Sequence, residues 1–365
     1  MKRYILYFTV LIMSLNLCDA YSQNYNGSSQ ELFFGWQASA RAEAMGRGLS
    51  AVTGDALSFY YNPAGLASAE GLNLFGSFAG PYYTLDTADY NYFGASYKIK
   101  KYGAVGFSRD YFTYGYDVIK TDEFGNITGT YEPHYTNYRL TLSSEVIKDL
   151  FVGLNMNLFQ PRLSDNEFTV GNETGSGNSD VFYVDLGVIK SLNIKSKKLQ
   201  HNFNFATSMI NLNFAEVKMV DASQADPLPV IFRLGASYNL LIEDMSIISK
   251  LRSYNILLNL EYEDLFNSKY YGGFHSGLEF TFLEMLSLRG GYYTQKIQEC
   301  ENCKDNLSEF TYGFGVNVPV NQLSKGKVPL EVKFDYVNLK QPSQINDKDD
   351  WNNFHVYTFR ASWIF

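Results

Sequence analysis

Residues 328–340 read VPLEVKFDYVNLK, and apolar and polar side chains alternate along this stretch. In an extended strand, successive side chains point to opposite faces, so four apolar residues would share one face: Leu330, Val332, Phe334 and Tyr336. The charged residues Glu331, Lys333 and Asp335 would share the other face. The stretch therefore predicts a β-strand with one apolar face and one polar face.

The same alternation recurs from residue 71 to the end of the chain. We predict about fourteen strands, at 71–80, 88–99, 102–118, 132–147, 150–162, 179–193, 199–211, 228–242, 255–265, 272–283, 286–297, 309–320, 328–340 and 354–365. A soluble sandwich also alternates, but its strands average about five or six residues. A membrane-spanning strand needs roughly 9–11 residues, and most of these segments reach that length. Their length therefore favours a membrane-spanning barrel.

The connections between the predicted strands also differ in length. Counted from the first strand, the odd connections are mostly long and the even ones mostly short, with 243–254 as the exception. Bacterial barrels combine long extracellular loops, short periplasmic turns and an even number of strands. We therefore expect an all-β protein, an antiparallel outer-membrane barrel of about fourteen strands over residues 71–365.

Aromatic residues lie near the ends of the predicted strands, where a barrel carries its two interfacial girdles. Examples are the pairs Tyr111-Phe112 and Tyr292-Tyr293. The last strand ends with Trp363 and Phe365, and a terminal aromatic residue is typical of the insertion signal of outer-membrane barrels. The pairs Gly272-Gly273 and Gly290-Gly291 mark positions where a strand could bend.

Residues 1–22 have the features of a secretory signal peptide. Lys2 and Arg3 precede an apolar run that ends at small residues. Beyond it the chain has no run of 18 apolar residues, so transmembrane helices are not expected. With 19% charged residues and a formal net charge of −8, the chain also lacks the basic character of a nucleic-acid-binding protein.

The stretch at 41–67, RAEAMGRGLSAVTGDALSFYYNPAGLA, differs from the rest of the chain. It is rich in small residues and contains Asn62-Pro63-Ala64-Gly65, which combines a turn initiator with a flexible residue. Such a segment is expected to fold compactly against another surface. We predict that residues 23–70 form an N-terminal segment with short helical or irregular structure, ahead of the barrel.

Parts of this stretch resemble the N-terminal signature of the FadL superfamily, and within it the PorV/PorQ branch. The matching parts are Ala42–Gly46, Asp55-Ala56 and Tyr60–Ala67, whereas Arg47 and Gly48 stand where that branch often carries small residues. The resemblance implies a fourteen-stranded outer-membrane barrel of a Gram-negative bacterium, of the Bacteroidota in the case of PorV/PorQ. It also implies that the N-terminal segment plugs the lumen.

The resemblance implies two kinds of function. PorV-like members bind protein partners or cargo of the type IX secretion system, and FadL-like members pass long-chain fatty acids or other hydrophobic molecules. This chain is shorter than a typical fatty-acid transporter, so the first reading is the main expectation and the second the alternative. The expected partners are outer-membrane lipid, secretion-system proteins or secreted cargo, or a hydrophobic small molecule, with no nucleic acid.

The candidate site residues follow from this interpretation. The plug motif comprises Arg41, Met45, Gly46, Asp55, Asn62, Pro63, Ala64 and Gly65, although Asn62–Gly65 also fits a plain turn into the first strand. Seven charged residues would face the lumen: Arg233, Glu261, Glu263, Glu331, Lys333, Asp335 and Arg360. Because an unpaired buried charge is costly, several of them should pair with each other or with the plug. A water-filled lumen that solvates them is the alternative.

Cys300 and Cys303 are two residues apart in an odd, hence extracellular, connection. Such a spacing suits a redox pair or half of a zinc site, but the chain offers no second pair and no nearby His, so a local disulfide is favoured. The four His residues are scattered, and no Ser has the context of a catalytic nucleophile. We therefore expect a non-enzymatic protein without a cofactor or a metal, with a barrel enzyme built from separate strands as the remaining alternative.

Overall fold

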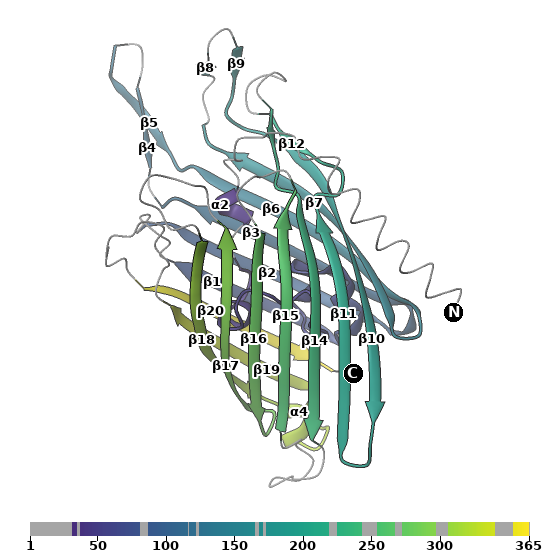
Figure 1. Ribbon diagram of the computed structural model, residues 1–365. Coiled ribbons are helices and arrows are strands. Elements are labelled where there is room, and N and C mark those ends of the chain that lie inside the picture. The colour runs from purple at the N-terminus through teal and green to yellow at the C-terminus, as the bar shows by residue number, and fades with distance from the viewer. Residues whose placement is uncertain are drawn as a thin grey trace, which may run out of the picture.

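The computed structural model describes residues 31–34, 37–80, 87–115, 117–121, 124–164, 168–170, 173–218, 225–242, 254–266, 272–296, 306–339 and 353–364. Fourteen antiparallel strands close into a barrel in chain order, and the last strand pairs with the first (Figure 1). The strands are β1 (Leu72–Gly80), β2 (Asp89–Ile99), β3 (Gly103–Thr113), β6 (His134–Ile147), β7 (Leu150–Arg162), β10 (Val181–Lys195), β11 (Leu199–Ile210), β14 (Ile231–Ile242), β15 (Tyr254–Leu265), β16 (Gly272–Phe282), β17 (Leu286–Lys296), β18 (Asn306–Val318), β19 (Leu330–Leu339) and β20 (Phe354–Trp363). The predicted fourteen-stranded antiparallel barrel is confirmed.

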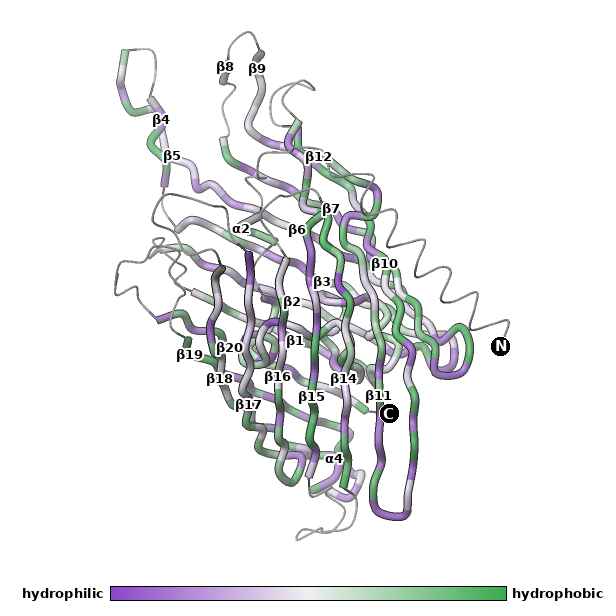
Figure 2. Tube along the Cα trace, in the orientation of Figure 1, coloured by the Kyte–Doolittle hydropathy of each residue, from purple (hydrophilic) through white to green (hydrophobic). Residues whose placement is uncertain are grey.

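The barrel carries its apolar side chains on the outside. On β15, Leu258, Leu260 and Tyr262 are 45%, 52% and 45% exposed, whereas Asn259 and Glu261 between them are 3% and 2% exposed. Apolar and polar residues alternate in this way along the strands (Figure 2). A wall that is apolar outside and polar inside is the reverse of a soluble protein and suits a lipid bilayer.

The two ends of the barrel differ. At one end, which we call the turn end, neighbouring strands are joined by tight turns such as Lys148-Asp149 and by the short helix α4 (Val320–Leu323). At the other, the hairpin end, three small additional sheets extend the connections: β4 (Val118–Thr121) with β5 (Ile127–Tyr131), β8 (Phe168–Val170) with β9 (Glu173–Gly175), and β12 (Glu216–Val217) with β13 (Asp226–Pro227). Figure 1 shows that they project beyond the barrel. The strand pattern did not predict these hairpins.

Residues 37–70 lie inside the barrel, and we call them the lumenal segment. They contain the helix α3 (Ala40–Ala44) and the 3-10 helices η1 (Ser58–Tyr60) and η2 (Pro63–Ser68), and the short helix α2 (Glu31–Phe34) precedes them. Ser39 caps α3, because its hydroxyl accepts a hydrogen bond of 3.2 Å from the Ala42 N–H. Among the described residues, no helix is long and apolar enough to cross a membrane.

Asn62-Pro63-Ala64 does not form a turn that leads directly into the first strand. Asn62 is the N-cap of η2 and accepts a hydrogen bond of 3.0 Å from the Ala64 N–H, and Pro63 occupies the first helical position, where its missing N–H costs nothing. The chain enters β1 later, at Leu72, after Gly71, whose φ is 69°. The motif is therefore the start of a helical turn deep in the lumen.

The strand pairing of the barrel is uneven. Among the residues that the structure describes, β18 and β19 share six residue pairs, which join Gly313–Val318 to Val332–Val337, and we call this junction the β18–β19 seam. Every other neighbouring pair shares between eight, as for β1 and β2, and thirteen, as for β6 and β7. β16 begins at Gly272, and the pairing of β17 runs unbroken through Gly290-Gly291, so this second glycine pair does not interrupt its strand.

Candidate functional site: the lumen and the segment inside it

Glycines on the inner wall allow the lumenal segment to approach the strands closely. A Cβ added at Gly277 would lie 2.5 Å from the carbonyl oxygen of Met45, and one at Gly313 would lie 2.8 Å from the Cβ of Ala44. Glycines on seven strands face the segment in this way: Gly106, Gly153, Gly187, Gly235, Gly277, Gly291 and Gly313. We call them the glycine contacts. They allow backbone to pack against backbone around much of the barrel.

Polar side chains of the wall satisfy the backbone groups of the lumenal segment. His275 Nδ1 donates to the Gly46 carbonyl over 2.8 Å, and Thr311 Oγ1 accepts from the Gly46 N–H over 3.0 Å. Ser237 donates to the carbonyl of Ala51 over 2.8 Å. Further donors on the wall reach the carbonyls of Phe59, Tyr61 and Ala64: Asn155, Ser208 and Ser143. Because buried backbone groups need partners, these bonds hold an irregular segment inside the barrel.

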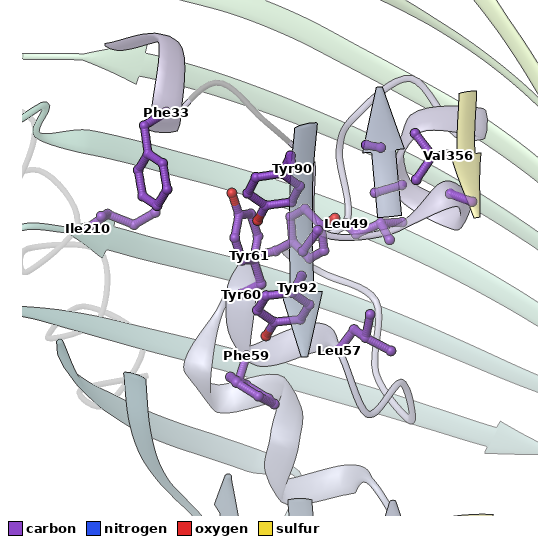
Figure 3. Close-up of a cluster of buried hydrophobic side chains, with 14 of the residues drawn as sticks. Phe33, Leu49, Leu57, Phe59, Tyr60, Tyr61, Tyr90, Tyr92, Ile210 and Val356 are labelled. Atoms are coloured by element: carbon purple, nitrogen blue, oxygen red, sulfur yellow. The ribbon is translucent and has the colours of Figure 1, made fainter. Parts of the chain in front are cut away.

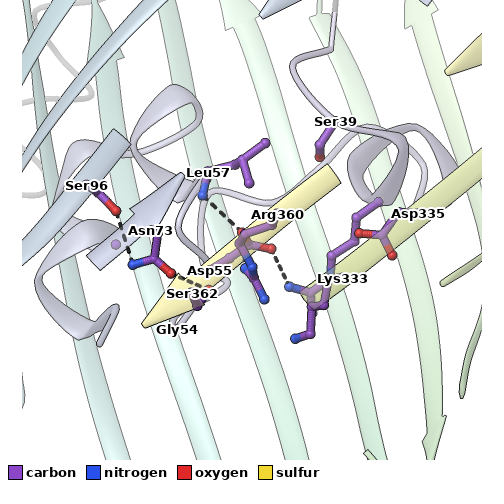
Figure 4. A network of polar contacts seen from close by, with 12 residues as sticks. Ser39, Gly54, Asp55, Leu57, Asn73, Ser96, Lys333, Asp335, Arg360 and Ser362 are labelled. Carbon is purple, nitrogen blue, oxygen red and sulfur yellow. Dashed lines mark hydrogen bonds and ion pairs between the residues drawn. The ribbon is translucent and has the colours of Figure 1, made fainter. Parts of the chain in front are cut away.

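An ion-pair network joins the lumenal segment to the wall on its turn-end side. Arg41 on α3 contacts Asp55 and, on β16, Glu279, each over 2.6 Å. Asp55 also contacts Arg360 of β20 over 3.1 Å and accepts from the Leu57 N–H over 3.0 Å (Figure 4). Burial raises the pKa of the Asp55 carboxyl, but Arg360 and Arg41 outweigh that effect and hold its pKa well below the usual range. Asp55 is therefore an ionised link between the segment and the wall.

The other predicted lumen charges also face inward and lie in two groups. Asp335 contacts Arg289 over 2.6 Å, and Lys333 contacts Glu331 over 3.3 Å, next to the Asp55 network. The second group is Arg233 with Glu263 over 2.6 Å and Glu261 over 3.7 Å, and Glu261 also accepts from the Ser50 N–H over 2.7 Å. These charges are paired with each other, and some of them contact the segment.

A polar cavity of about 550 Å³ lies between the lumenal segment and the turn end. Charged side chains of the first group line it together with the amides of Asn202, Asn239, Asn255 and Asn317. Wall residues near the turn end are thus hydrophilic. Among the residues that the structure describes, no cluster of His, Cys, Asp and Glu could hold a metal ion.

On the hairpin-end side of the segment, the lumen is rich in buried aromatic rings, and Arg139 of β6 pairs with Asp110 of β3 among them over 3.2 Å. The wall supplies buried rings that point inward from β2, β3, β6, β7 and β10: Tyr90, Tyr92, Phe112, Tyr135, Phe159 and Tyr183. Phe33 of α2 packs on Phe159 with ring centroids 5.1 Å apart and on Tyr135 at 5.8 Å. Phe34 lies 5.9 Å from Tyr183. Two phenylalanines of the chain itself thus occupy this aromatic site.

Tyrosines of the lumenal segment extend this aromatic region toward the middle of the barrel. Tyr60 lies 5.0 Å from Tyr61 and 5.5 Å from Tyr92, measured between ring centroids, and Figure 3 shows them together with Tyr90. Arg139 of β6 lies over the Tyr60 ring at 5.0 Å. The Tyr60-Tyr61 pair of the sequence motif is therefore part of the lining rather than a surface feature.

The apolar region continues across the lumen to the β18–β19 seam. One contiguous cluster of buried residues includes Phe33, the alanines of α3, and the hairpin-end residues Val337, Leu339, Phe354 and Val356. Helix α3 lies against β18 and β19, where Thr311 of β18 donates to the carbonyl of Ala44 over 3.1 Å. The junction with the fewest pairs between described residues is thus backed from inside by an alanine-rich helix.

The sequence analysis did not anticipate the apolar half of the lumen. It assigned the pairs Tyr111-Phe112 and Tyr292-Tyr293 to the outer girdles, yet Phe112 and Tyr293 are 0% and 2% exposed and face inward. The sequence does carry a signal for inward-facing apolar residues. Near the hairpin end, strand segments such as Val181–Val184 are apolar on both faces. Trp363 pairs with Leu72 and Leu330 near the turn end, whereas Cys300, Cys303 and Phe365 lie outside the described residues.

No protein-family model and no curated protein matches the chain. Solved structures that are similar to it include the CymD monoaromatic hydrocarbon channel, at 12% identity over 90% of this chain and 97% of that one, with a TM-score of 0.45. A Pseudomonas aeruginosa FadL homologue matches at 9% identity over 89% and 98%, with a TM-score of 0.45. The Pseudomonas putida toluene transporter TodX matches at 11% over 90% and 98%, also with a TM-score of 0.45. At such low identity, nothing about this chain's substrate follows from these proteins, and the resemblance to the PorV/PorQ branch stays a prediction.

Proposed function

We propose that the protein is an outer-membrane channel for hydrophobic small molecules, and that α2 and the lumenal segment hold it closed. The contiguous apolar cluster that runs from the aromatic site around Phe33 to the β18–β19 seam supports this function most strongly. A binding pocket for an apolar ligand needs such a lining with few polar groups. This is the second of the two functions that the resemblance implied.

Entry would begin at the aromatic site. Phe33 and Phe34 of α2 pack against wall rings in tilted and edge-on arrangements, in the place that an apolar ligand would occupy. A long-chain fatty acid or an aromatic hydrocarbon that displaces them regains the same apolar burial, about 1.5–3 kcal/mol for each such side chain. Ligand and α2 therefore compete for one site.

The polar turn-end cavity makes straight passage through the barrel unfavourable. An apolar molecule that moved past the segment would have to disrupt the paired charges around Asp55 and Arg41 and enter a hydrophilic space. Part of the apolar cluster lies to the side, at the alanines of α3 and at Val337 of β19. We place the exit there, where six residue pairs join the two strands over the described part of the chain, against eight or more at the other junctions.

Ligand binding to the purified protein in detergent tests this function, with radiolabelled oleate and toluene as probes. The double variant Phe33→Ala/Phe34→Ala should bind one or both probes about tenfold more tightly than the wild type, because the internal competitor has lost its rings. Phe205→Ala is the matched control, since Phe205 is 54% exposed on the outer face. Absence of saturable binding, or equal affinity in all three proteins, contradicts the proposal.

A second candidate function is the binding of secretion-system proteins or cargo, as in the PorV/PorQ branch. The three hairpins that project beyond the barrel favour it, because they add a surface that a closed channel does not require. Purification from the native membrane distinguishes the two functions. Stoichiometric recovery of a type IX translocon subunit or of exported cargo supports this candidate, and recovery of lipid alone opposes it.

A further inference from the structure

A pocket outside the lumen has chemistry that the channel function does not use. It encloses about 460 Å³ at the hairpin end, and its lining includes Tyr111 of β3, His134 of β6, Arg162 of β7 and Glu132 after β5. His134 and Arg162 are directly opposite each other on neighbouring strands. The pocket is thus built on three adjacent strands of the barrel and on the base of the β4–β5 hairpin.

The alternation of the strands shows that this pocket opens on the outer surface of the barrel. On β3, Asp110 and Phe112 are 1% and 0% exposed in the lumen, so Tyr111 between them points outward. On β6, Tyr135 is 2% exposed in the lumen, and its neighbour His134 points outward. The pocket therefore faces the membrane rather than the channel.

Its height along the strands places the pocket above the apolar band. Phe107 and Tyr138 are 51% and 36% exposed on the outer face, and Tyr111 and His134 lie four residues beyond them on the same strands. Four residues correspond to roughly 13 Å along a strand, or about 9 Å of height at a tilt near 45°. That height falls in the headgroup layer rather than in the hydrocarbon core.

One polar atom of the pocket lacks a hydrogen-bond donor. Asn178 lines the pocket, and its Oδ1 is buried without a hydrogen-bond partner among the residues that the structure describes. Arg162 is already engaged, since it donates to the carbonyls of Pro161 and Ser179 and contacts Asp180. With the carboxylate of Glu132 beside it, the pocket is poorly suited to an anion and well suited to hydroxyl groups.

Aromatic rings supply the remaining part of the lining. Tyr111 and His134 have ring centroids 5.4 Å apart and an interplanar angle of 33°, and Tyr131 lines the pocket from the hairpin. Flat rings cover the C–H face of a sugar, while acceptors such as Asn178 Oδ1 bind its hydroxyls. We propose that this pocket binds a saccharide at headgroup level, either as part of a glycolipid of the outer leaflet or as a free oligosaccharide.

The test measures saccharide binding by the full chain in phosphatidylcholine nanodiscs. The probes are a short-core lipopolysaccharide and the lipid-free oligosaccharide that mild acid releases from it. Tyr111→Ala should weaken the binding of at least one probe about tenfold, and Tyr111→Phe should restore it because the ring is retained. Tyr312→Ala is the matched control, since Tyr312 is 64% exposed on the outer face of β18, away from the pocket. Heat-modifiable gel migration verifies that each variant is folded.

The two probes distinguish the sources of the sugar. Binding of both, with the same sensitivity to Tyr111→Ala, indicates recognition of the saccharide alone, and binding of the lipopolysaccharide only, with that sensitivity, indicates a glycolipid. Either result supports the site. The proposal is overturned if neither probe binds saturably, or if Tyr111→Ala and Tyr312→Ala bind the lipopolysaccharide equally well, which would mean non-specific lipid association. Neither outcome depends on whether the lumen carries hydrophobic molecules.

Discussion

At the scale of single residues, the glycine contacts and the charge of Asp55 explain how an irregular segment stays inside the barrel. A side chain at a glycine contact would occupy space that the segment already fills, with backbone at Gly153, Gly277 and Gly291 and with side chains at the other four. Asp55 links that segment to two arginines, one on α3 and one on β20. Both features are local enough for single substitutions to test.

Gly291 and Gly290 offer a matched comparison on β17. A Cβ at Gly291 would meet the backbone of Met45 and Gly46, whereas the nearest atom to a Cβ at Gly290 would be 3.9 Å away. We expect Gly291→Ala to destabilise the closed barrel by about 1–3 kcal/mol, since overpacking displaces the segment. Gly290→Ala should be neutral or slightly stabilising. The midpoint of the heat-induced shift in gel migration measures both, and equal effects of the two changes would argue against close packing at Gly291.

Asp55→Asn should remove an acid-sensitive part of the stability. The folded state lowers the pKa of Asp55, so the ion pairs contribute fully above the ordinary carboxyl pKa near 4 and are lost as the pH falls through the folded value. At pH 7 the variant should lose on the order of 3 kcal/mol, because Arg41 and Arg360 both lose the carboxylate that they share.

The corresponding measurement compares the heat-shift midpoint at pH 7 and pH 3. The wild type should lose stability on acidification by more than the Asp55→Asn variant does. Asp180→Asn is the control, because Asp180 is an exposed partner of Arg162 and such pairs are worth less than about 1 kcal/mol. An Asp55→Asn protein that matches the wild type at both pH values would show that the network does not hold the segment.

At the scale of elements, the strands followed from the sequence and the contents of the lumen did not. Alternation over nine or more residues gave the strands of the wall, because lipid outside and polar groups inside impose a strict period of two. The same reasoning placed Phe112 and Tyr293 in the outer girdle, where the structure does not have them. Alternation alone does not show which face of a strand points into the lumen when both faces carry aromatic rings.

The lumenal segment was also predicted only in part from the sequence. The sequence motif singled out Asn62-Pro63-Ala64-Gly65 and Arg41, and the structure places all of them in the lumen. The glycine contacts could not be predicted, because each depends on register between a strand and a segment up to 269 residues away, as for Gly313 and Ala44. Register of that kind is fixed by packing and leaves no local pattern in the sequence.

The small number of residue pairs at the β18–β19 seam predicts faster amide hydrogen exchange there. Amide hydrogens at the hairpin end of β18, around Phe310–Tyr312, should exchange with solvent faster than those in the middle of β11, where pairing to both neighbours is continuous. Hydrogen exchange measured by mass spectrometry in detergent checks this. Equal protection of the two strands would show that the seam is no weaker than the rest of the wall.

At the scale of the whole molecule, the barrel is divided into two unlike halves by one segment. Toward the turn end the lumen is a polar, ion-paired cavity, and toward the hairpin end it is rich in buried aromatic rings, with Arg139 and Asp110 paired among them. A general pore would not need this asymmetry. A channel that admits hydrophobic molecules at one end and releases them through its wall would need it, because the polar half opposes passage straight through the barrel.

Cross-linking the seam during transport tests the central claim most directly. In a Cys300→Ser/Cys303→Ser background, Phe314→Cys/Tyr336→Cys joins directly paired residues of β18 and β19, and Phe334→Cys/Phe359→Cys joins directly paired residues of β19 and β20 as a control. Cells that express each variant take up radiolabelled oleate or toluene under oxidising and reducing conditions. Uptake through the oxidised seam variant should fall to the level of cells without the protein and return on reduction, while the control stays unchanged. Unchanged uptake with the seam locked would contradict a lateral exit at this position, and absence of uptake by the wild type would contradict the channel itself.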